Sequence, residues 1–309
     1  MPPARPPTRD DVERAAATIG ARLRATPTLA SSTLKARLKC ELFQRTGSFK
    51  SHGALNKLAS LTPAERRRGV IAISAGNHAQ AVAYAAAAEG VDALVVMWRG
   101  ASEQKIAATR GYGAGVDLHA TDPATAFERL HELLDETGRT LVHPFDDPVV
   151  IAGAGTVGLE IEAAAPEADA IVVPVGGGGL IAGIQAAVGD RMRVVAVEPE
   201  TSRALHQAAA NDGPTPVTPT SIADGLNAPF LGRIPFDLCR RLERVLVSEI
   251  EIENAFRVLY ERAKLACEPA GAAATAAWLS GRIEAENPVV LVSGGNVAAQ
   301  TAAAILARR

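Results

Sequence analysis

The chain has 309 residues, of which 48% are hydrophobic, and its formal net charge is −2 at pH 7. This length suffices for two ordinary domains with buried cores, and the near-neutral charge gives no reason to expect a nucleic-acid partner or an anionic membrane. No apolar run is long enough to span a bilayer, and the proline-rich start lacks the apolar core of a signal peptide. Cys40, Cys239 and Cys267 are far apart and in no metal spacing, which predicts free thiols in the cytoplasm.

Short apolar runs alternate with amphipathic segments along most of the chain. Strands are expected at 70–73, 93–97, 116–119 and 140–142 and, after a turn-rich break at 143–148, at 170–175, 194–197, 245–248 and 289–292. Helices are expected at 10–24, with Asp10 or Asp11 as its cap, and at 49–58, 77–89, 102–110, 124–137, 180–188, 250–266, 270–285 and 297–307, with a further long helix after the break. Residues 25–48 are expected to be irregular and 211–219 to form a surface loop. This alternation is typical of βαβ units, so we predict an α/β fold with two parallel sheets and a cleft between two domains.

Lys50 lies in a setting that would suit a reactive lysine. Ser48 is a natural N-cap, so Lys50 falls in the first turn of the helix expected at 49–58, where the positive end of the helix dipole disfavours a cation. In an apolar site both effects would lower the pKa of Lys50 and free its amine to form a Schiff base. A surface lysine that happens to follow a cap is the alternative interpretation of this stretch.

Two motifs follow predicted strands and open predicted helices. Ser74-Ala75-Gly76-Asn77-His78 would offer the free N–H groups of a helix start to an anion such as a substrate carboxylate, and the Asn77 amide could bind a cofactor oxygen. Gly176-Gly177-Gly178-Gly179-Leu180 would let several backbone N–H groups converge with no side chain in the way. The second motif lacks the lysine of a P-loop and matches a dinucleotide fingerprint poorly, so it favours a compact monophosphate. An ordinary capped turn is the alternative for the first.

Ser293-Gly294-Gly295-Asn296 is a third glycine turn after a strand, and Ser293 could face a ring nitrogen or simply cap a helix. Glu198, Asp224-Gly225 and Glu268 lie at further element ends and are weaker signals one by one. The sequence shows no Gly-x-Ser-x-Gly elbow and no zinc motif. A lysine primed for a Schiff base, a phosphate-binding turn and a hydroxyl for a ring nitrogen are together what pyridoxal phosphate (PLP) requires.

These motifs resemble those of the fold-type II PLP enzymes, in the branch of threonine and serine dehydratases and serine racemase. The resemblance runs from about residue 23 to 296 and is carried by Thr46-Gly47-Ser48-Phe49-Lys50 and the three glycine-containing motifs above. It implies two open, mostly parallel twisted sheets flanked by helices, with the cofactor in the cleft. It also implies a large cofactor-binding domain of 1–67 plus 147–309, a small inserted domain of 68–146, and a homodimer.

The resemblance implies a role for each matching residue. Lys50 would be the catalytic residue and carry the cofactor as a Schiff base, with Phe49 beside the ring. The remaining cofactor contacts would be Asn77 at the 3′ oxygen, Ser293 at the ring nitrogen, Gly225 along the ring, and Gly176, Gly177, Gly178, Gly179 and Leu180 at the phosphate. The substrate carboxylate would lie on Ser74, Ala75, Gly76, Asn77 and His78.

The implied reaction is loss of water from L-threonine, L-serine or a related 3-hydroxy amino acid, such as 3-hydroxyaspartate, to give a 2-oxo acid and ammonia. Serine racemase is the alternative within the fold, but racemases of this branch have a serine where this chain has Ala75, and a methyl group cannot reprotonate Cα. The branch's divalent-metal site is matched at Glu198, but Ala204 stands where that site has an aspartate, so the resemblance does not imply a bound metal. A phosphate-binding module without catalysis is the alternative from a different class.

Overall fold

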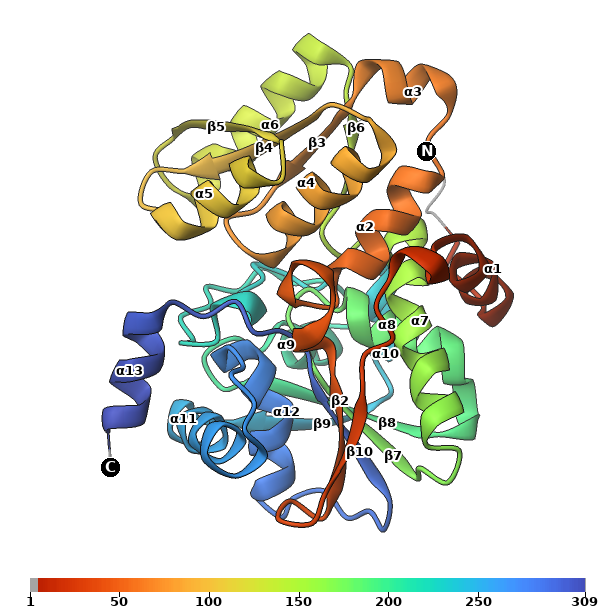
Figure 1. Ribbon diagram of the computed structural model, residues 1–309, viewed down its shortest axis with the longest axis vertical. Helices are drawn as coiled ribbons and strands as arrows, with labels where there is room; N and C mark the ends of the chain where they lie inside the picture. The colour runs from red at the N-terminus through yellow and green to blue at the C-terminus, as the bar shows by residue number, and fades with distance from the viewer. Residues whose placement is uncertain (1–4, 309) are drawn as a thin grey trace.

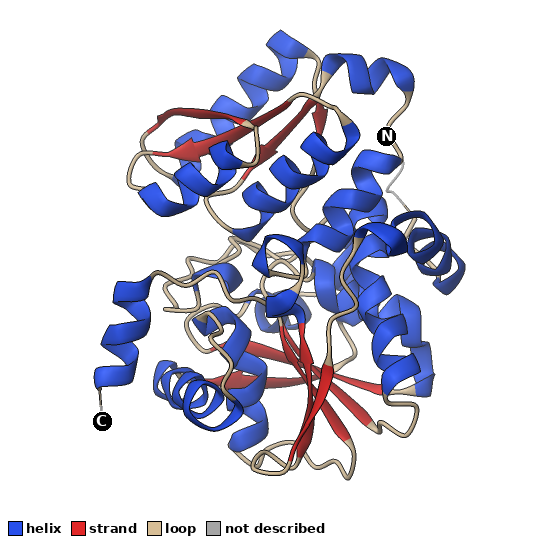
Figure 2. Cartoon of the chain, in the orientation of Figure 1, coloured by secondary structure: helices blue, strands red, loops and turns tan. Residues whose placement is uncertain are grey.

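Two sheets flanked by helices make up the computed structural model, which describes residues 5–308 (Figures 1 and 2). The first, four-stranded sheet has the order β5-β4-β3-β6, and every neighbouring pair is parallel. Its strands are β3 (Val70–Ile73), β4 (Ala93–Trp98), β5 (Gly115–Ala120) and β6 (Thr140–Leu141). The helices around it are α3 (Pro63–Arg68), α4 (Asn77–Glu89), α5 (Glu103–Gly111) and α6 (Pro123–Thr137).

The second, six-stranded sheet has the order β1-β2-β10-β7-β8-β9 and is parallel except for β1. Its strands are β1 (Thr28–Ser31), β2 (Ala36–Cys40), β7 (Ala170–Pro174), β8 (Arg193–Pro199), β9 (Glu243–Val247) and β10 (Pro288–Val292). The long helices are α1 (Arg9–Ile19), α2 (Lys50–Ala59), α7 (Pro148–Ala164), α8 (Gly179–Val188), α11 (Glu249–Val258) and α12 (Pro269–Leu279), and shorter ones are α9 (Ala204–Ala210), α10 (Arg233–Cys239) and α13 (Ala299–Ala307). The predicted fold class is confirmed.

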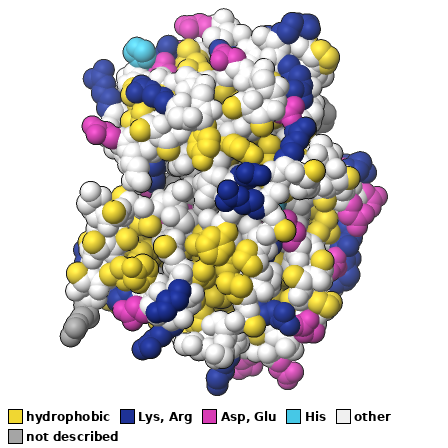
Figure 3. Space-filling view, viewed as in Figure 1, with side chains coloured by type: hydrophobic (Ala, Val, Ile, Leu, Met, Phe, Trp, Pro, Cys, Tyr) yellow, Lys and Arg dark blue, Asp and Glu magenta, His cyan; other side chains and the backbone are white. Residues whose placement is uncertain are grey.

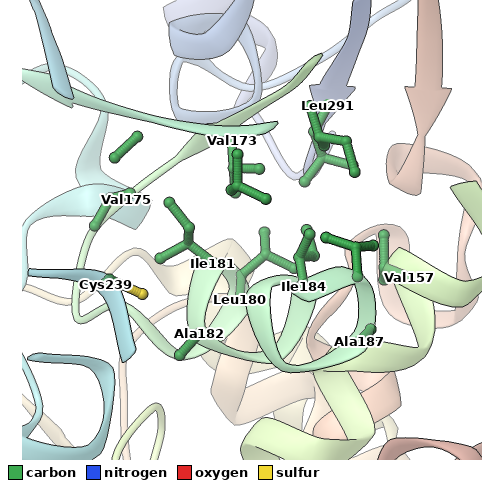
Figure 4. Packing of buried hydrophobic residues seen from close by; sticks show 14 of the residues in the cluster. Val157, Val173, Val175, Leu180, Ile181, Ala182, Ile184, Ala187, Cys239 and Leu291 are labelled. Carbon is green, nitrogen blue, oxygen red and sulfur yellow. The ribbon is translucent and has the colours of Figure 1, made fainter. Parts of the chain in front are cut away.

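Alternate residues of the central strands face opposite helix layers, as the two-residue period of a strand requires. In β7, Ile171 and Val173 join the core formed with α7 and α8, whereas Val172 joins the core formed with α11 and α12. Figure 4 shows Val173 and Leu291 of the sheet packed over Ile181 and Ile184 of α8. This packing anchors the helix that starts at the tetraglycine turn.

The carboxyl ends of the parallel strands place the three glycine-containing motifs. The segment 74–78 follows β3, 176–180 follows β7 and 293–296 follows β10. Strands of the four-stranded sheet all lie within 68–146, and those of the six-stranded sheet all lie outside that range. The exact division into two domains stays a prediction.

Several local expectations are wrong. Helix α1 is capped by Thr8 with Asp11 rather than by Asp10 or Asp11. Helix α2 begins at Lys50, and Ser48 does not cap it: Ser48 is extended, forms a bridge with Gly294, and its buried hydroxyl has no hydrogen-bond partner in the described chain. The segment expected to be irregular contains β1 and β2. The helix expected over 250–266 ends as a π-turn at Leu259–Ala263.

Charged side chains of both signs are spread over the face in Figure 3, including a Lys/Arg group near its middle, and hydrophobic side chains gather above and below that group. Over residues 5–308, no helix combines the length and the apolar character needed to cross a bilayer.

Candidate active site

A single cavity of about 870 Å³ brings the three motifs together with Lys50. It is lined by residues that follow β3, β7 and β10, as expected where the carboxyl ends of parallel strands meet. Every residue predicted to contact the cofactor or the substrate lines this cavity: Phe49, Lys50, Ser74, Ala75, Gly76, Asn77, His78, Gly176, Gly177, Gly178, Gly179, Leu180, Gly225 and Ser293.

Lys50 is held at the start of α2 with its amine in the cavity. The Nζ atom donates a hydrogen bond to the carbonyl oxygen of Pro144 at 2.8 Å and lies 5.2 Å from the centre of the Phe49 ring. Burial lowers the pKa of Lys50 to about 8, although the charge of Glu268 opposes the shift. The amine is therefore partly uncharged near neutral pH, as a Schiff-base lysine requires.

The tetraglycine turn has space for backbone alone. A Cβ atom on Gly177 would lie 2.2 Å from the Phe145 ring, one on Gly178 would lie 2.6 Å from Pro235, and one on Gly179 would lie 2.9 Å from the Cα of Phe145. Gly178 also has a φ of +90°, which side chains rarely tolerate. The turn leads directly into α8, whose first N–H groups have no partner within the helix, so these N–H groups are free and no side chain covers them.

The loop after β3 forms a second helix start at the cavity. Gly76 donates its N–H to the Ser74 hydroxyl at 3.1 Å and precedes the first turn of α4. The last residue of the motif is His78, whose Nε2 donates a hydrogen bond to the carbonyl oxygen of Val142 at 2.8 Å. Burial, with the charge of Lys50, lowers the pKa of His78 to about 3, so the ring is neutral and contributes no charge of its own.

We call each sheet with its surrounding helices a sheet unit. Asn77 belongs to the four-stranded unit and is fixed by two partners from the six-stranded unit. Its Nδ2 donates to Glu268 Oε1 at 2.6 Å, and its Oδ1 accepts from Asn296 Nδ2 at 2.8 Å. Burial and the charge of Asp224 raise the pKa of Glu268 to about 7. Sequence reasoning missed a site role for Glu268 and Asn296. A glutamate directly before the proline that opens a helix was the available signal for Glu268, and the SGGN motif was the signal for Asn296.

Glu198 lies fully buried at the end of β8 and does not line the cavity. Its carboxylate accepts hydrogen bonds from the backbone N–H groups of Leu205 and His206 at the start of α9. Within residues 5–308, no cluster of three or more His, Cys, Asp or Glu side chains is arranged to hold a metal ion. The sequence match of Glu198 to a metal ligand stays untested.

The family model described as pyridoxal-phosphate dependent enzyme matches residues 20–295 of the chain. The chain belongs to this family. It is therefore a PLP-dependent enzyme, and the residues around its cavity fit that cofactor: a lysine with a lowered pKa lines the same cavity as a helix-start turn whose glycines leave no room for a side chain.

Relatives of this PLP-dependent enzyme cover most of its length. The catabolic L-threonine dehydratases TdcB of Escherichia coli and of Staphylococcus aureus are each 42% identical to it over 93% of the chain, and the matches cover 92% and 88% of those proteins. Among solved structures, maize serine racemase matches with a TM-score of 0.92 at 33% identity, covering 96% of both chains. The processed threonine deaminase isoform 2 of Solanum lycopersicum matches with a TM-score of 0.89 at 30% identity, covering 99% of this chain and 96% of that one.

Proposed function

We propose that this enzyme is an ammonia-lyase that removes water from L-threonine, L-serine or a related 3-hydroxy amino acid and releases a 2-oxo acid and ammonia. The observation that carries the proposal is Lys50, a lysine with a pKa lowered to about 8 in the same cavity as the tetraglycine turn. The full-length similarity to named threonine dehydratases supports this reaction over others of the family.

Each predicted site residue then has a task. The N–H groups of Gly176, Gly177, Gly178, Gly179 and Leu180 would hold the cofactor phosphate. Asn77 and Ser293 would contact the ring, and the start of α4 at Ser74–His78 would hold the substrate carboxylate through free N–H groups. These contacts orient the amino acid so that its Cα hydrogen lies near Lys50, which lowers the entropic part of the barrier.

When bound, PLP supplies an electron-withdrawing ring that makes the Cα proton of the amino acid removable. The uncharged amine of Lys50 takes that proton, because it lines the cavity and its pKa is lowered to about 8. The 3-hydroxyl group is lost, so a proton and a hydroxide leave as water and a double bond forms between Cα and C3. Water then hydrolyses the released unsaturated amine to a 2-oxo acid and ammonia.

Ser293 supports elimination over other outcomes. It is buried at the end of β10 and offers a neutral hydroxyl to the cavity. A hydroxyl does not hold a ring nitrogen in its protonated form as a carboxylate would, so the electron demand on the substrate is weaker. A weaker demand favours prompt loss of the 3-hydroxyl over a long-lived carbanion.

The test is release of ammonia and 2-oxo acid from a panel containing L-threonine, L-serine and 3-hydroxyaspartate. The wild type should be yellow with bound PLP, lose its colour on borohydride treatment and act on at least one member of the panel. Lys50→Ala should abolish both the visible band and product release. Lys57→Ala is the matched control, because Lys57 lies on the same helix but pairs with Asp147 and does not line the cavity. A colourless, inactive wild type would favour the non-catalytic binding module.

Serine racemase is a second candidate because maize serine racemase matches nearly the whole chain. The methyl group of Ala75 lines the cavity where the loop after β3 approaches it, and it cannot donate or accept a proton. We therefore predict that the wild type leaves unreacted L-serine almost entirely in the L form and that Ala75→Ser gains measurable racemisation. Chiral chromatography of leftover serine checks both; unchanged chirality in Ala75→Ser would count against this account of the loop.

We also propose that the enzyme is cytoplasmic and forms a homodimer. Cys40, Cys239 and Cys267 are free and buried, which supports a reducing compartment. The homodimer follows from the family resemblance alone, and sedimentation of the PLP-loaded protein measures it.

A further inference from the structure

A chain of hydrogen bonds crosses from one sheet unit to the other beside the cavity. Asn296 Nδ2 donates both to the carbonyl oxygen of Thr46 at 2.7 Å and to Asn77 Oδ1 at 2.8 Å. Asn77 Nδ2 in turn donates to Glu268 Oε1 at 2.6 Å. Asn77 opens α4 of the four-stranded unit, whereas its partners precede α12 and follow β10 of the six-stranded unit.

The Thr46 end of this chain of bonds determines which way each amide points. The backbone carbonyl of Thr46 only accepts hydrogen bonds, so the NH₂ group of Asn296 must face it. The same NH₂ group donates to Asn77 Oδ1, which leaves the NH₂ group of Asn77 facing Glu268. Asn296 then uses both of its N–H groups, and Asn77 uses one. A single N–H of Asn77 is left without a partner in this chain of bonds, on a side chain that lines the cavity.

Two motif glycines make room for the network. A Cβ atom on Gly294 would lie 2.3 Å from Glu268 Oε1 and 3.2 Å from Asn77 Nδ2. A Cβ atom on Gly47 would lie 2.6 Å from Asn296 Oδ1. The backbone of these two motifs therefore packs directly against the polar atoms that fix Asn77.

We propose that Glu268 is a positioning residue for Asn77, whose amide it orients so that the remaining N–H donates to an oxygen atom of the PLP ring. This inference rests on the proposed function, because it takes PLP as the occupant of the cavity. Glu268 is 3% exposed, so its bond to Asn77 is shielded from water, and removing a buried acceptor leaves the Asn77 donor unsatisfied and free to turn.

Three charged groups surround Glu268 from other elements. Lys50 comes from α2, Lys105 from α5 and Asp224 from the turn η5 (Asp224–Leu226). Asp224 is the useful comparison, because it is a second carboxylate at the cavity but has no hydrogen bond to Asn77.

The test is a double-mutant cycle on PLP affinity, measured by titrating PLP into the cofactor-depleted enzyme and following the visible band. Glu268→Ala and Asn77→Ala should each weaken binding about tenfold. The double variant should be no weaker than Asn77→Ala, because Glu268 acts through Asn77. Glu268→Gln keeps an oxygen that accepts from Asn77, so it should restore affinity to within about threefold of the wild type.

Controls separate positioning from general damage. In the variant that combines Asp224→Asn with Asn77→Ala, the two fold-changes in PLP affinity should multiply. Each variant should keep the helix content of the wild type. Should Glu268→Ala not fold, Asn296→Ala replaces it in the cycle, with the same expected non-additivity. Multiplied effects of Glu268→Ala and Asn77→Ala, or a folded Glu268→Gln as weak as Glu268→Ala, would overturn the inference. A wild type that binds no PLP would instead refute the proposed function.

Discussion

The cavity holds two ionisable groups whose pKa values are moved towards neutrality from opposite directions. Burial lowers the pKa of Lys50 to about 8 and raises that of Glu268 to about 7. Both shifts have the same cause, since a low-dielectric site disfavours each charged form. Such groups mark functional sites more often than ion pairs on the surface do.

The raised pKa of Glu268 makes stability depend on pH. Between the ordinary pKa of 4.5 and about 7 the folded chain holds a proton that the unfolded chain releases, so the free energy of unfolding should fall as pH rises through this window. The size of this contribution is about 3 kcal/mol. Glu268→Gln stays neutral, so its slope between pH 5 and 7 should be flatter in denaturant unfolding. Parallel slopes in the two proteins would contradict the shift.

Replacing Ser293 by aspartate tests the choice of a neutral partner at the end of β10. A carboxylate there would favour a protonated ring nitrogen, so we expect Ser293→Asp to lower the rate of ammonia release at least about tenfold. Ser293→Ala, which is neutral and smaller, controls for loss of the hydroxyl alone. An undiminished elimination rate in Ser293→Asp would show that the charge state of the ring is unimportant here.

Among the secondary-structure elements, the alternation of apolar strands and amphipathic helices could be predicted from the sequence, whereas a strand that contains a buried charged side chain could not. The strands β3, β4, β7, β8 and β10 are apolar runs between helices, and they lie close to where the pattern predicts them. Strand β2 was missed because it contains Lys39, which is 1% exposed and pairs with Glu160 on α7. A strand that contains a lysine resembles a polar loop in the sequence, and the buried partner that explains the lysine lies 121 residues away.

The same limit applies to the candidate site. The glycine motifs and Lys50 could be predicted because each depends on neighbours in the sequence. Glu268 and Phe145 matter only through contacts made by folding: the first meets Asn77 across the two units, and the second covers Gly177. Ser48 shows the converse, since a good local cap is overruled by its bridge to Gly294.

The tetraglycine turn gives a prediction for this element. Gly177→Ala would place a methyl group 2.2 Å from the Phe145 ring, so the ring or the turn must move and the N–H groups would no longer converge. We expect PLP affinity to fall at least about tenfold. Gly20→Ala is the matched control, because no atom lies within 4 Å of its added methyl group, and it should keep wild-type affinity. Equal affinity of both variants would show that the turn does not hold the phosphate.

For the whole molecule, the cavity depends on how the two sheet units are held together. The Asn77–Glu268 bond is one buried link, and the ion pair between Lys105 of α5 and Asp224 of η5 is a second, more exposed one. Both links lie at the same cavity, because the side chains of both pairs are among the residues that line it. Figure 1 shows α5 in the upper unit facing the lower unit across this region.

The exposed ion pair should tune substrate capture more than chemistry. Side chains of Lys105 and Asp224 are 21% and 57% exposed, so the pair is worth at most about 1 kcal/mol and should weaken with salt. We expect Lys105→Met to raise KM for the amino acid about threefold at low salt with kcat nearly unchanged, and the difference should shrink at high salt. The exchanged variant Lys105→Asp with Asp224→Lys keeps the attraction with its direction reversed, so its KM should return most of the way to the wild-type value. A loss of kcat without a change in KM, or a KM effect that ignores salt, would mean that Lys105 acts on the reacting atoms instead of through its ion pair with Asp224.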